Sequence, residues 1–300
     1  MNTALLRRCL REPRIRVGLV LTGLVLLVTF AGPFLAPHAH DDIVGAPYAA
    51  PSSTALLGTD YLGEDVLSRV LAGGRSIVWI AFAGTLAGVA AGAAIGMTAA
   101  YSGGVLDEIL MRAMDVLRAF PPLVLILLLV AMARASTALL PLIVAVAWVP
   151  QVARVAYGAS REVVSSEFVE SAETLGAPRL RIVRREILPN VMTPLMVEFG
   201  LRLTWSIGIV TAMSFLGVGL QPPAADWGLM IKENYQGLAL QPWGVVLPVL
   251  CIAVFTFGTN LITEGFSWTV ARVSSQDVSS PDVPTPEVPT PEVPAQEVKS

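Results

Sequence analysis

Four long runs without a charged residue constrain this chain more than any other feature. They cover residues 17–36, 76–102, 135–153 and 244–263. A helix rises about 1.5 Å per residue, so about 20 apolar residues cross a hydrocarbon core. Because lipid offers backbone groups no hydrogen-bond partner, such runs fold as helices. Only 14% of the residues are charged and 54% are hydrophobic, which excludes an ordinary soluble domain.

The hydropathy pattern predicts an all-α membrane protein with six transmembrane helices. The expected spans are Val17–Ala36, Ser76–Ala100, Ala113–Ala133, Thr137–Tyr157, Val191–Val218 and Gly244–Phe266. The first run is too long for a typical signal peptide, so we interpret it as a retained span. The third is the least apolar and contains Arg118, Pro121 and Pro122. Neighbouring helices can satisfy the backbone groups that proline leaves free.

The spans divide the chain into an N-terminal segment (1–16), a first helix with a long loop (17–75), a core (76–270) and a tail (271–300). Residues 281–300 repeat Val-Pro-Thr-Pro-Glu with slight variation. Proline removes amide donors and this repeat has no apolar face to bury, so we expect the tail to be disordered.

Positive charge predicts the orientation, because cytoplasmic loops are enriched in arginine and lysine. Ten arginines precede the first span or lie between the fourth and fifth: Arg7, Arg8, Arg11, Arg14, Arg16, Arg161, Arg179, Arg181, Arg184 and Arg185. Segment 38–75 has five acids and only two arginines. Both termini and the loop at about 160–190 are therefore expected in the cytoplasm. Segments 38–75 and 220–243 are expected outside, where Trp227, Tyr235 and Trp243 are candidate membrane-interface anchors.

Two patterns inside the spans call for an interpretation. Gly84, Gly88, Gly92 and Gly96 recur every fourth residue and fall along one helix stripe, which predicts close helix packing rather than chemistry.

Glu198 and Arg202 are one turn apart in the fifth span, acid first, the favourable order for an ion pair. They either face a solute pathway or form a self-neutralised pair near the cytoplasmic end that faces other protein, and the second interpretation is favoured.

Several kinds of chemistry have no support in the sequence. The only lysines, Lys232 and Lys299, lack the glycine-rich context of a P-loop, so the chain is not predicted to hydrolyse ATP. His38 and His40 stand beside acids in an aqueous loop and are interpreted as solvated, so no metal site is expected. The spans contain no credible catalytic set, and no basic face beyond the topological arginines indicates nucleic-acid binding.

The loop between the fourth and fifth spans predicts a compact helical knob. Ser165 or Ser166 can cap a short helix that begins near Glu167, and Gly176 can end it before Pro178. A second short helix is expected from Arg179 towards Leu188, with Pro189 opening the fifth span. Such a knob either seats in a groove on a partner protein or is an ordinary amphipathic loop at the membrane surface.

This loop resembles the "EAA" loop of importer-type ABC permeases. The matching positions are Glu170, Ser171, Ala172, Gly176, Leu188 and Pro189, with Ser171 replacing the second residue of the usual Glu-Ala-Ala. A second segment resembles the extracytoplasmic signature of peptide and nickel permeases through Gly58, Thr59, Asp60, Gly63, Asp65, Ser68 and Arg69. Glu64 stands where that signature usually has arginine. Residues 111–121 and 214–228 also match, and the resemblance covers roughly residues 11–266.

The resemblance is to the "C"-type permease subunit of dipeptide or oligopeptide importers, which implies the type I importer fold. It implies a second homologous permease, two ATP-binding-cassette ATPase subunits that hold ATP and magnesium, and a periplasmic or lipid-anchored solute-binding protein. The ATPase-coupling residues would be Glu170, Ser171, Ala172, Leu175, Gly176, Leu188 and Pro189. No cofactor is expected in this chain. The alternatives are a stand-alone channel or ion-coupled carrier, which would need more intramembrane ionisable groups or repeats, and a membrane enzyme.

Overall fold

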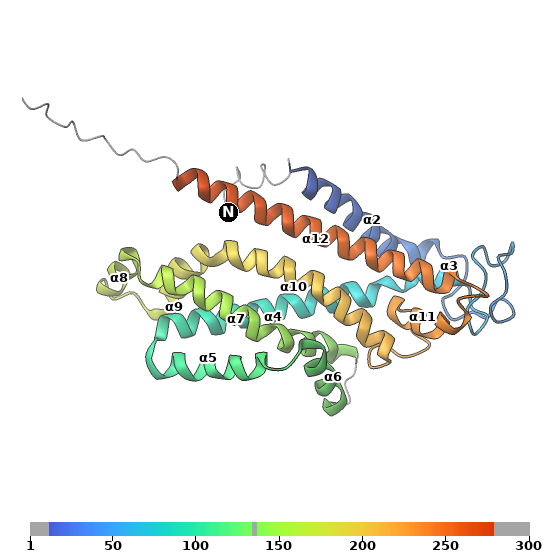
Figure 1. Ribbon diagram of the computed structural model, residues 1–300, viewed down its shortest axis with the longest axis horizontal. Helices are drawn as coiled ribbons and strands as arrows, with labels where there is room; N and C mark the ends of the chain where they lie inside the picture. Colours follow the sequence, from blue (N-terminus) through green and yellow to red (C-terminus); the bar gives the residue numbers. More distant parts are fainter. Residues whose placement is uncertain (1–11, 134–136, 279–300) are drawn as a thin grey trace, which may run out of the picture.

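The structure is a computed structural model, which describes residues 12–133 and 137–278, and this part of the chain is helical (Figure 1). Two isolated β-bridges, Ile43 with Glu64 and Thr59 with Asp65, are the only strand-like pairings among these residues. The predicted all-α class is confirmed. The α-helices are α2 (Pro13–Leu35), α3 (Val66–Ala72), α4 (Gly74–Ser102), α5 (Gly104–Arg118), α6 (Pro122–Ala133), α7 (Leu140–Val164), α8 (Glu167–Thr174), α9 (Arg179–Ile182), α10 (Leu188–Leu216), α11 (Trp227–Asn234) and α12 (Trp243–Val278).

Five helical stretches are long and apolar enough to cross a membrane. They are α2, α3 with α4, α7, the stretch from α9 through α10, and α12 as far as Arg272. Counting α5 and α6 together as one bent span gives the predicted six. The bundle has two distinct ends (Figure 1). We call them the α8 end, toward which α12 runs, and the α11 end, which also holds α3.

The third span differs from the prediction of one helix over Ala113–Ala133. Helix α5 begins nine residues earlier, at Gly104, and α6 leaves it at an angle of 91°. The chain breaks at residues 119–121 because Pro121 and Pro122 lack the amide hydrogens that a continuing helix needs, and proline disfavours helical geometry in the residue before it. Alone, the 12 residues of α6 are about 18 Å long, too short to cross a hydrocarbon core.

Helices α4 and α7 form the most closely packed pair, and the four glycines of the stripe lie between them. A Cβ atom added to Gly84 would lie 2.8 Å from Val144, and one on Gly88 would lie 2.9 Å from the Ala145 carbonyl oxygen. The corresponding distances are 2.7 Å from Gly92 to Val152 and 2.3 Å from Gly96 to the Ala153 oxygen. Only glycine lets the two backbones come this close.

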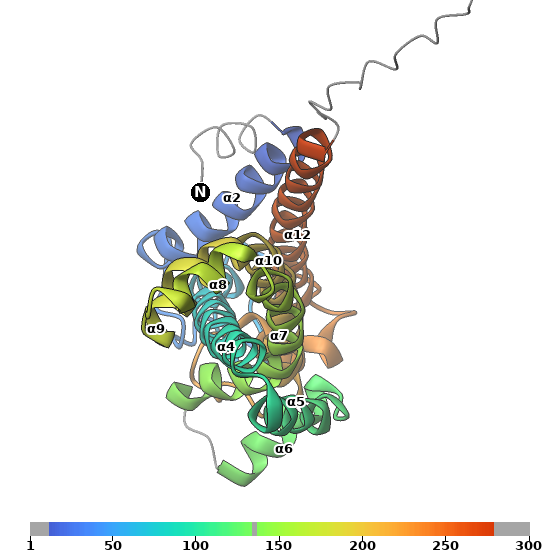
Figure 2. The same ribbon diagram turned by 90° about the vertical axis from the view of Figure 1, so that its left-hand side faces the viewer.

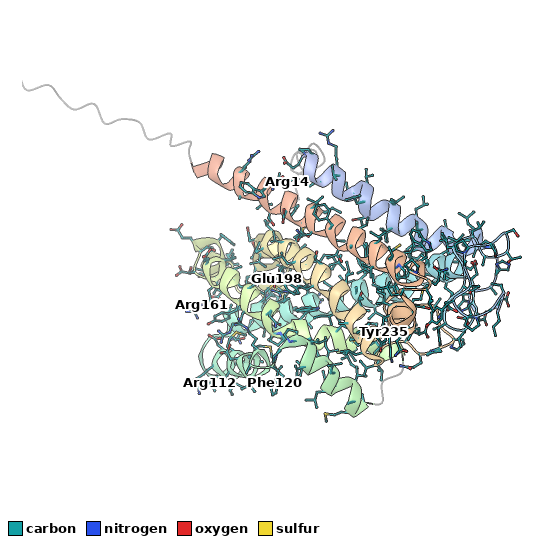
Figure 3. The ribbon with its side chains drawn as sticks, turned by 45° about the vertical axis from the view of Figure 1, so that its right-hand side comes forward. Arg14, Arg112, Phe120, Arg161, Glu198 and Tyr235 are labelled. Atoms are coloured by element: carbon teal, nitrogen blue, oxygen red, sulfur yellow. The ribbon has the colours of Figure 1, made fainter. Side chains whose placement is uncertain are left out.

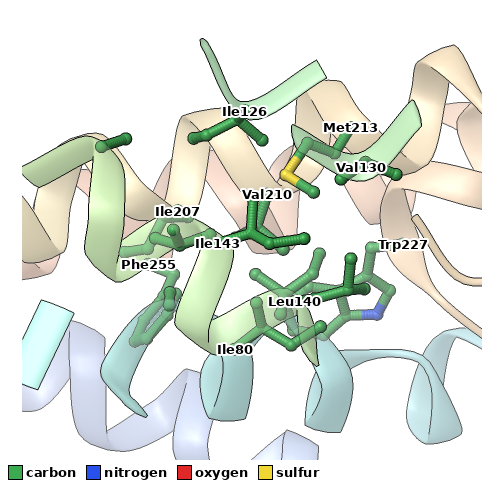
Figure 4. Close-up of a cluster of buried hydrophobic side chains, with 14 of the residues drawn as sticks. Ile80, Ile126, Val130, Leu140, Ile143, Ile207, Val210, Met213, Trp227 and Phe255 are labelled. Atoms are coloured by element: carbon green, nitrogen blue, oxygen red, sulfur yellow. The ribbon is translucent and has the colours of Figure 1, made fainter. Parts of the chain in front are cut away.

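Helix α2 packs along α12 on the other side of the bundle, as the end-on view shows (Figure 2). Glycines again allow the approach, since a Cβ on Gly18 would lie 2.7 Å from the Gly258 oxygen. A shared apolar core joins α4, α6, α7, α10, α11 and α12 (Figure 4). Its buried members include Ile126 of α6, Ile207 of α10 and Trp227 of α11. The bent α6 is therefore held by the core despite its short length.

Besides α5, three helix ends extend well beyond the prediction. Helix α7 ends at Val164, seven residues after the predicted end at Tyr157. Helix α2 begins at Pro13, inside the segment expected to precede the span. Helix α12 continues to Val278, so residues 271–278 are helical although the prediction assigned them to the disordered tail. The repeat in residues 281–300 and the arginines at positions 7, 8 and 11 lie outside the described residues.

Candidate docking loop and intramembrane pair

The predicted knob forms as helix α8 at the α8 end of the bundle (Figure 1). Glu167 and Glu170 lie in its first turn, where negative charge favours the helix dipole. The expected cap is wrong in detail: Ser166 is the N-cap residue, but its hydroxyl donates to the Val163 oxygen rather than accepting from the helix. The Ser171 hydroxyl donates to the Glu167 oxygen at 2.8 Å, which keeps it on the helix surface.

Gly176 ends α8 through the geometry that the sequence indicates. Its φ is +73°, a left-handed backbone conformation that residues with a Cβ atom rarely adopt. The amide of Gly176 donates to the Glu173 oxygen at 2.9 Å, and the Ala177 amide donates to the Ala172 oxygen at 3.1 Å. These two bonds make a Schellman motif, which closes the helix C-terminus tightly. The turn after α8 therefore has one defined geometry.

One face of α8 is anchored to the bundle and the other is open. Val169 is buried in an apolar cluster with Val152 of α7 and Val191 of α10, and Ala172 and Ala177 pack against it. Tyr101 at the end of α4 lies close to Glu173 of α8. Glu170, Ser171, Leu175 and Gly176 are exposed, and the Leu175 side chain is 86% exposed at the tip. A stiff helix thus presents an uncovered leucine.

The second predicted helix does not stand apart from the fifth span. Residues 179–216 are one continuous helical stretch, in which Val183–Ile187 form a π-helical turn between α9 and α10. Pro189 lies in the first turn of α10, and its nitrogen carries no hydrogen to donate to the carbonyl four residues earlier. The helix accommodates this missing hydrogen bond by widening into the π-helical turn. Leu188 packs against the same apolar cluster as Val169. The loop and the fifth span are therefore mechanically continuous.

Glu198 and Arg202 form the predicted ion pair, with Glu198 about a third of the way along α10 (Figure 3). Arg202 Nε donates to Glu198 Oε1 at 2.6 Å, and the guanidinium lies 5.2 Å from the centre of the Trp148 ring on α7. The Trp148 indole donates to the Ser206 hydroxyl at 2.8 Å, and Ser206 hydrogen-bonds Thr85 of α4 at 2.7 Å. A polar network thus joins three spans inside the bundle.

The second set of motif residues builds the α11 end. Asp65 caps α3 by accepting from the amide of Ser68 at 3.1 Å and from its hydroxyl at 2.6 Å. The Thr59 hydroxyl donates to the Ala46 oxygen at 2.6 Å. Gly58 and Gly63 have φ of +77° and +87°. A Cβ on Gly58 would lie 1.7 Å from the side-chain nitrogen Nε2 of Gln241. These residues therefore shape a folded loop.

Arg69 connects this loop to α11. Its guanidinium pairs with Asp60 of the loop and, at 3.0 Å, with Glu233 of α11. The Tyr61 amide donates to the Asn234 side chain at 3.0 Å. Glu233 and Asn234 were not among the predicted site residues, because their pairing with a loop more than 160 positions earlier has no local signal.

Trp227 is not the interface anchor that its residue type suggests. It is fully buried, and its indole donates to the Val70 oxygen at 2.8 Å. Tyr235 and Trp243 remain on the surface, 52% and 39% exposed. His38 and His40 lie near Asp65 and Asp41, at 3.7 and 3.6 Å, and within the described residues no group of three ligand-type side chains converges.

The chain is similar to known transport proteins over most of its length. Residues 88–269 match the family model described as "Binding-protein-dependent transport system inner membrane component". The dipeptide transport system permease protein DppC of Haemophilus influenzae is 31% identical over 83% of this chain and 87% of its own length. The glutathione transport system permease protein GsiD of Pectobacterium atrosepticum is 32% identical over 86% and 87%.

A solved structure supports the fold. A chain of the MetNI methionine ABC transporter in an inward facing conformation covers 67% of this chain and 96% of its own length. The TM-score is 0.50 at 19% identity, so this likeness concerns the fold alone. The expected importer-permease fold is confirmed. With its apolar helices and the family match over residues 88–269, this chain belongs to the binding-protein-dependent transport system inner membrane components, a family of multi-pass membrane permeases that are not themselves catalytic.

Proposed function

We propose that the chain is one permease subunit of an ATP-driven importer for peptides or related small solutes. It pairs with a second, homologous permease to frame the pathway, and two ATPase subunits bind below. ATP and magnesium are held by those partners and not by this chain. The relatives named for dipeptide and glutathione transport, each 31–32% identical, support this class of cargo.

The observation that carries the proposal is the construction of α8. Its buried face is fixed by Val169, its end is locked by Gly176, and its tip presents the exposed Leu175. Burying this exposed leucine in a pocket on a partner protein would remove its apolar surface from water, which favours association. The acidic first turn, with Glu170 exposed, adds charge to the rim of the same surface.

The continuous stretch from α9 through α10 offers a route for the motion. An ATPase subunit that moves α8 also moves the apolar cluster around Val169, into which α10 packs through Val191. Because packed interfaces switch between discrete arrangements, a small displacement at α8 can bias the whole of α10. Alternating access then follows from ATP binding in the partners.

The same proposal orients the chain. The α8 end faces the cytoplasm, with the ATPase subunits and both termini, and the α11 end faces the periplasm of a bacterial inner membrane. The loop with Thr59 and Asp65, together with α11, is the surface on which a solute-binding protein docks. Its interior is hydrogen-bonded across segments far apart in sequence, which holds the loop closed on α11 as a platform.

Leu175→Glu and Glu170→Arg test the docking role. We expect each variant to reach the membrane normally but to lose the ATPase subunits during purification, together with ATP-dependent uptake in proteoliposomes. Leu240→Glu is the matched control, since Leu240 is 74% exposed at the α11 end, and it should retain the ATPase subunits.

Normal ATPase retention and uptake in both α8 variants would contradict the docking role. Uptake by the chain alone, without ATPase partners, would instead support a stand-alone channel or ion-coupled carrier. If Glu198 and Arg202 face the pathway, their substitution will change cargo preference while ATPase binding stays intact.

A further inference from the structure

Arg69 is surrounded by more carboxyl groups than one guanidinium neutralises. Asp60 and Glu64 come from the loop before α3 and Glu233 comes from α11, and the Arg69 side chain is only 2% exposed. Glu64 Oε2 lies 2.6 Å from Arg69 Nη1, and Glu233 Oε2 lies 3.0 Å from Nη2. With every acid ionised, this buried cluster would carry two uncompensated negative charges, which a low-dielectric site disfavours strongly.

The hydrogen bonds show which of the three carboxyl groups lacks donors that would stabilise its negative charge. Arg69 donates to Asp60 Oδ2 and to Glu233 Oε2. The other Asp60 oxygen accepts from the amides of Leu62 and Glu64, both at 2.9 Å, so both Asp60 oxygens have donors. In contrast, Glu64 Oε2 is buried 2.6 Å from Arg69 Nη1 but accepts no hydrogen bond among the described residues. Glu64 is therefore the group that needs a proton.

The charged groups that act most strongly on Glu64 are one cation and two acids. Asp60 lies on its own loop, Arg69 on α3 and Glu233 on α11. The Tyr61 hydroxyl is engaged with Glu233 at 3.2 Å, and burial next to that carboxylate raises the pKa of Tyr61 to about 12, so it stays neutral. One guanidinium thus faces three acids.

We propose that this cluster is a proton-binding site: Glu64 carries a proton when the loop is closed on α11, shares it with Asp60, and releases it when the loop opens. The Glu64 carboxyl is within hydrogen-bonding reach of Asp60. Burial raises the pKa of Glu64 to about 7, with Arg69 opposing the shift and Asp60 and Glu233 adding to it. The inference concerns the platform formed by the loop before α3 and by α11, and it does not depend on which solute is carried.

The proton makes the closure of the platform dependent on pH. The closed form binds the proton up to about pH 7, whereas an open, solvated Glu64 has the ordinary value of 4.5. The closed form therefore holds more protons between these values, so its stability is full below pH 4.5 and falls as the pH rises to 7. From pH 5 to pH 8 the equilibrium constant for opening should rise about 70-fold.

Hydrogen exchange of the full chain in lipid nanodiscs measures this opening directly. The amides of Tyr61, Leu62 and Glu64 are bonded within the closed platform and are the reporters. After correction for the intrinsic pH dependence of exchange, their protection should fall by tens of fold from pH 5 to pH 8. Glu64→Gln keeps a neutral side chain at every pH and should remove most of this fall, leaving a smaller slope from Glu233, whose pKa burial also raises.

Glu108→Gln is the matched control, because Glu108 is an exposed carboxylate paired with Arg112 at the other end of the bundle. It should retain the full pH dependence. An equal loss of protection in Glu64→Gln and in the unmodified chain would overturn the proposal. If Glu64→Gln fails to fold, infrared spectroscopy of the unmodified chain decides: a protonated carboxyl band at pH 6 that disappears by pH 9 supports the site, and its absence at pH 6 rules the site out.

Discussion

Residues that are polar and buried carry much of the specificity of this bundle. Asp226 illustrates this, since it accepts from the Ser76 hydroxyl at 2.6 Å and from the Leu229 amide at 3.1 Å. It thereby caps α11 and ties that helix to the start of α4. Burial raises the pKa of Asp226. The hydrogen bonds from Ser76 and Leu229 oppose that shift, because they stabilise the charged carboxylate.

Replacing Asp226 tests the contribution of this cap. Asp226→Ala leaves two buried donors without an acceptor, and we expect a loss of about 2–3 kcal/mol in the free energy of unfolding. Asp226→Asn keeps an acceptor oxygen and should lose less. Asp42→Ala is the control, since exposed Asp42 caps only the Ala39 amide. Thermal unfolding in detergent gives the measurement, and equal effects at positions 226 and 42 would contradict the role.

The pair of Glu198 and Arg202 makes a second prediction for single residues. Removing one charge leaves the other unpaired inside a span, so Glu198→Gln should cost about 3 kcal/mol. The double variant Glu198→Gln with Arg202→Gln should recover part of that loss, because no lone charge remains. A double-mutant cycle of unfolding free energies measures the coupling. Strictly additive losses would show that the two side chains do not stabilise each other.

At the scale of elements, glycine marks where two helices pack closely. The stripe at Gly84, Gly88, Gly92 and Gly96 lies against α7, whereas a Cβ atom added to Gly208 of α10 would meet nothing within 4 Å. The four-residue spacing indicates a contact face. Which helix occupies that face follows only from the three-dimensional arrangement.

Substitution along the stripe should therefore be costly. Gly96→Ala brings a methyl group 2.3 Å from the Ala153 oxygen, so α4 and α7 must separate, and we expect a loss of about 1–3 kcal/mol. Gly208→Ala, the same change in open space, should be neutral or slightly stabilising because alanine favours helix. Thermal stability of the two variants makes the comparison. A Gly96→Ala variant as stable as Gly208→Ala would rule out tight packing at this site.

Proline shapes two other elements in ways that the pattern of hydropathy does not reveal. Pro121 and Pro122 break the third span by 91°, and Pro189 accompanies the π-helical turn that joins α9 to α10. Both sets of prolines are visible in the sequence. Their outcomes differ because the widened turn stays packed through Ile187 and Leu188, while α6 bends away to bury Ile126 and Val130 in the main core.

At the scale of the whole molecule, the two ends of the bundle have different roles in the proposed transporter. The α8 end presents the helix with Leu175, and the α11 end presents a folded loop that includes Leu56, which is 61% exposed. The arginine-rich segments predict that the α8 end is cytoplasmic.

Cysteine labelling tests this orientation. In a background without Cys9 and Cys251, Leu175→Cys should react with a membrane-impermeant thiol reagent only in inside-out vesicles, and Leu56→Cys only from outside the cell. Both positions are exposed, so the difference reports the side of the membrane and not burial. Labelling of residue 175 from outside would invert the topology and remove the proposed site of ATPase contact.

The sequence by itself determined the class of the protein, the positions of the apolar helices and the knob that ends at Gly176. These follow from runs of apolar residues and from local turn chemistry, which act over a few residues. Only the tertiary structure decided the partner of Arg69 on α11, the burial of Trp227, the burial of Glu198 beside Arg202, and the packing of α6 into the main core. The physical reason is that these features depend on contacts between segments far apart in sequence, where pairing and burial are settled by how the helices pack.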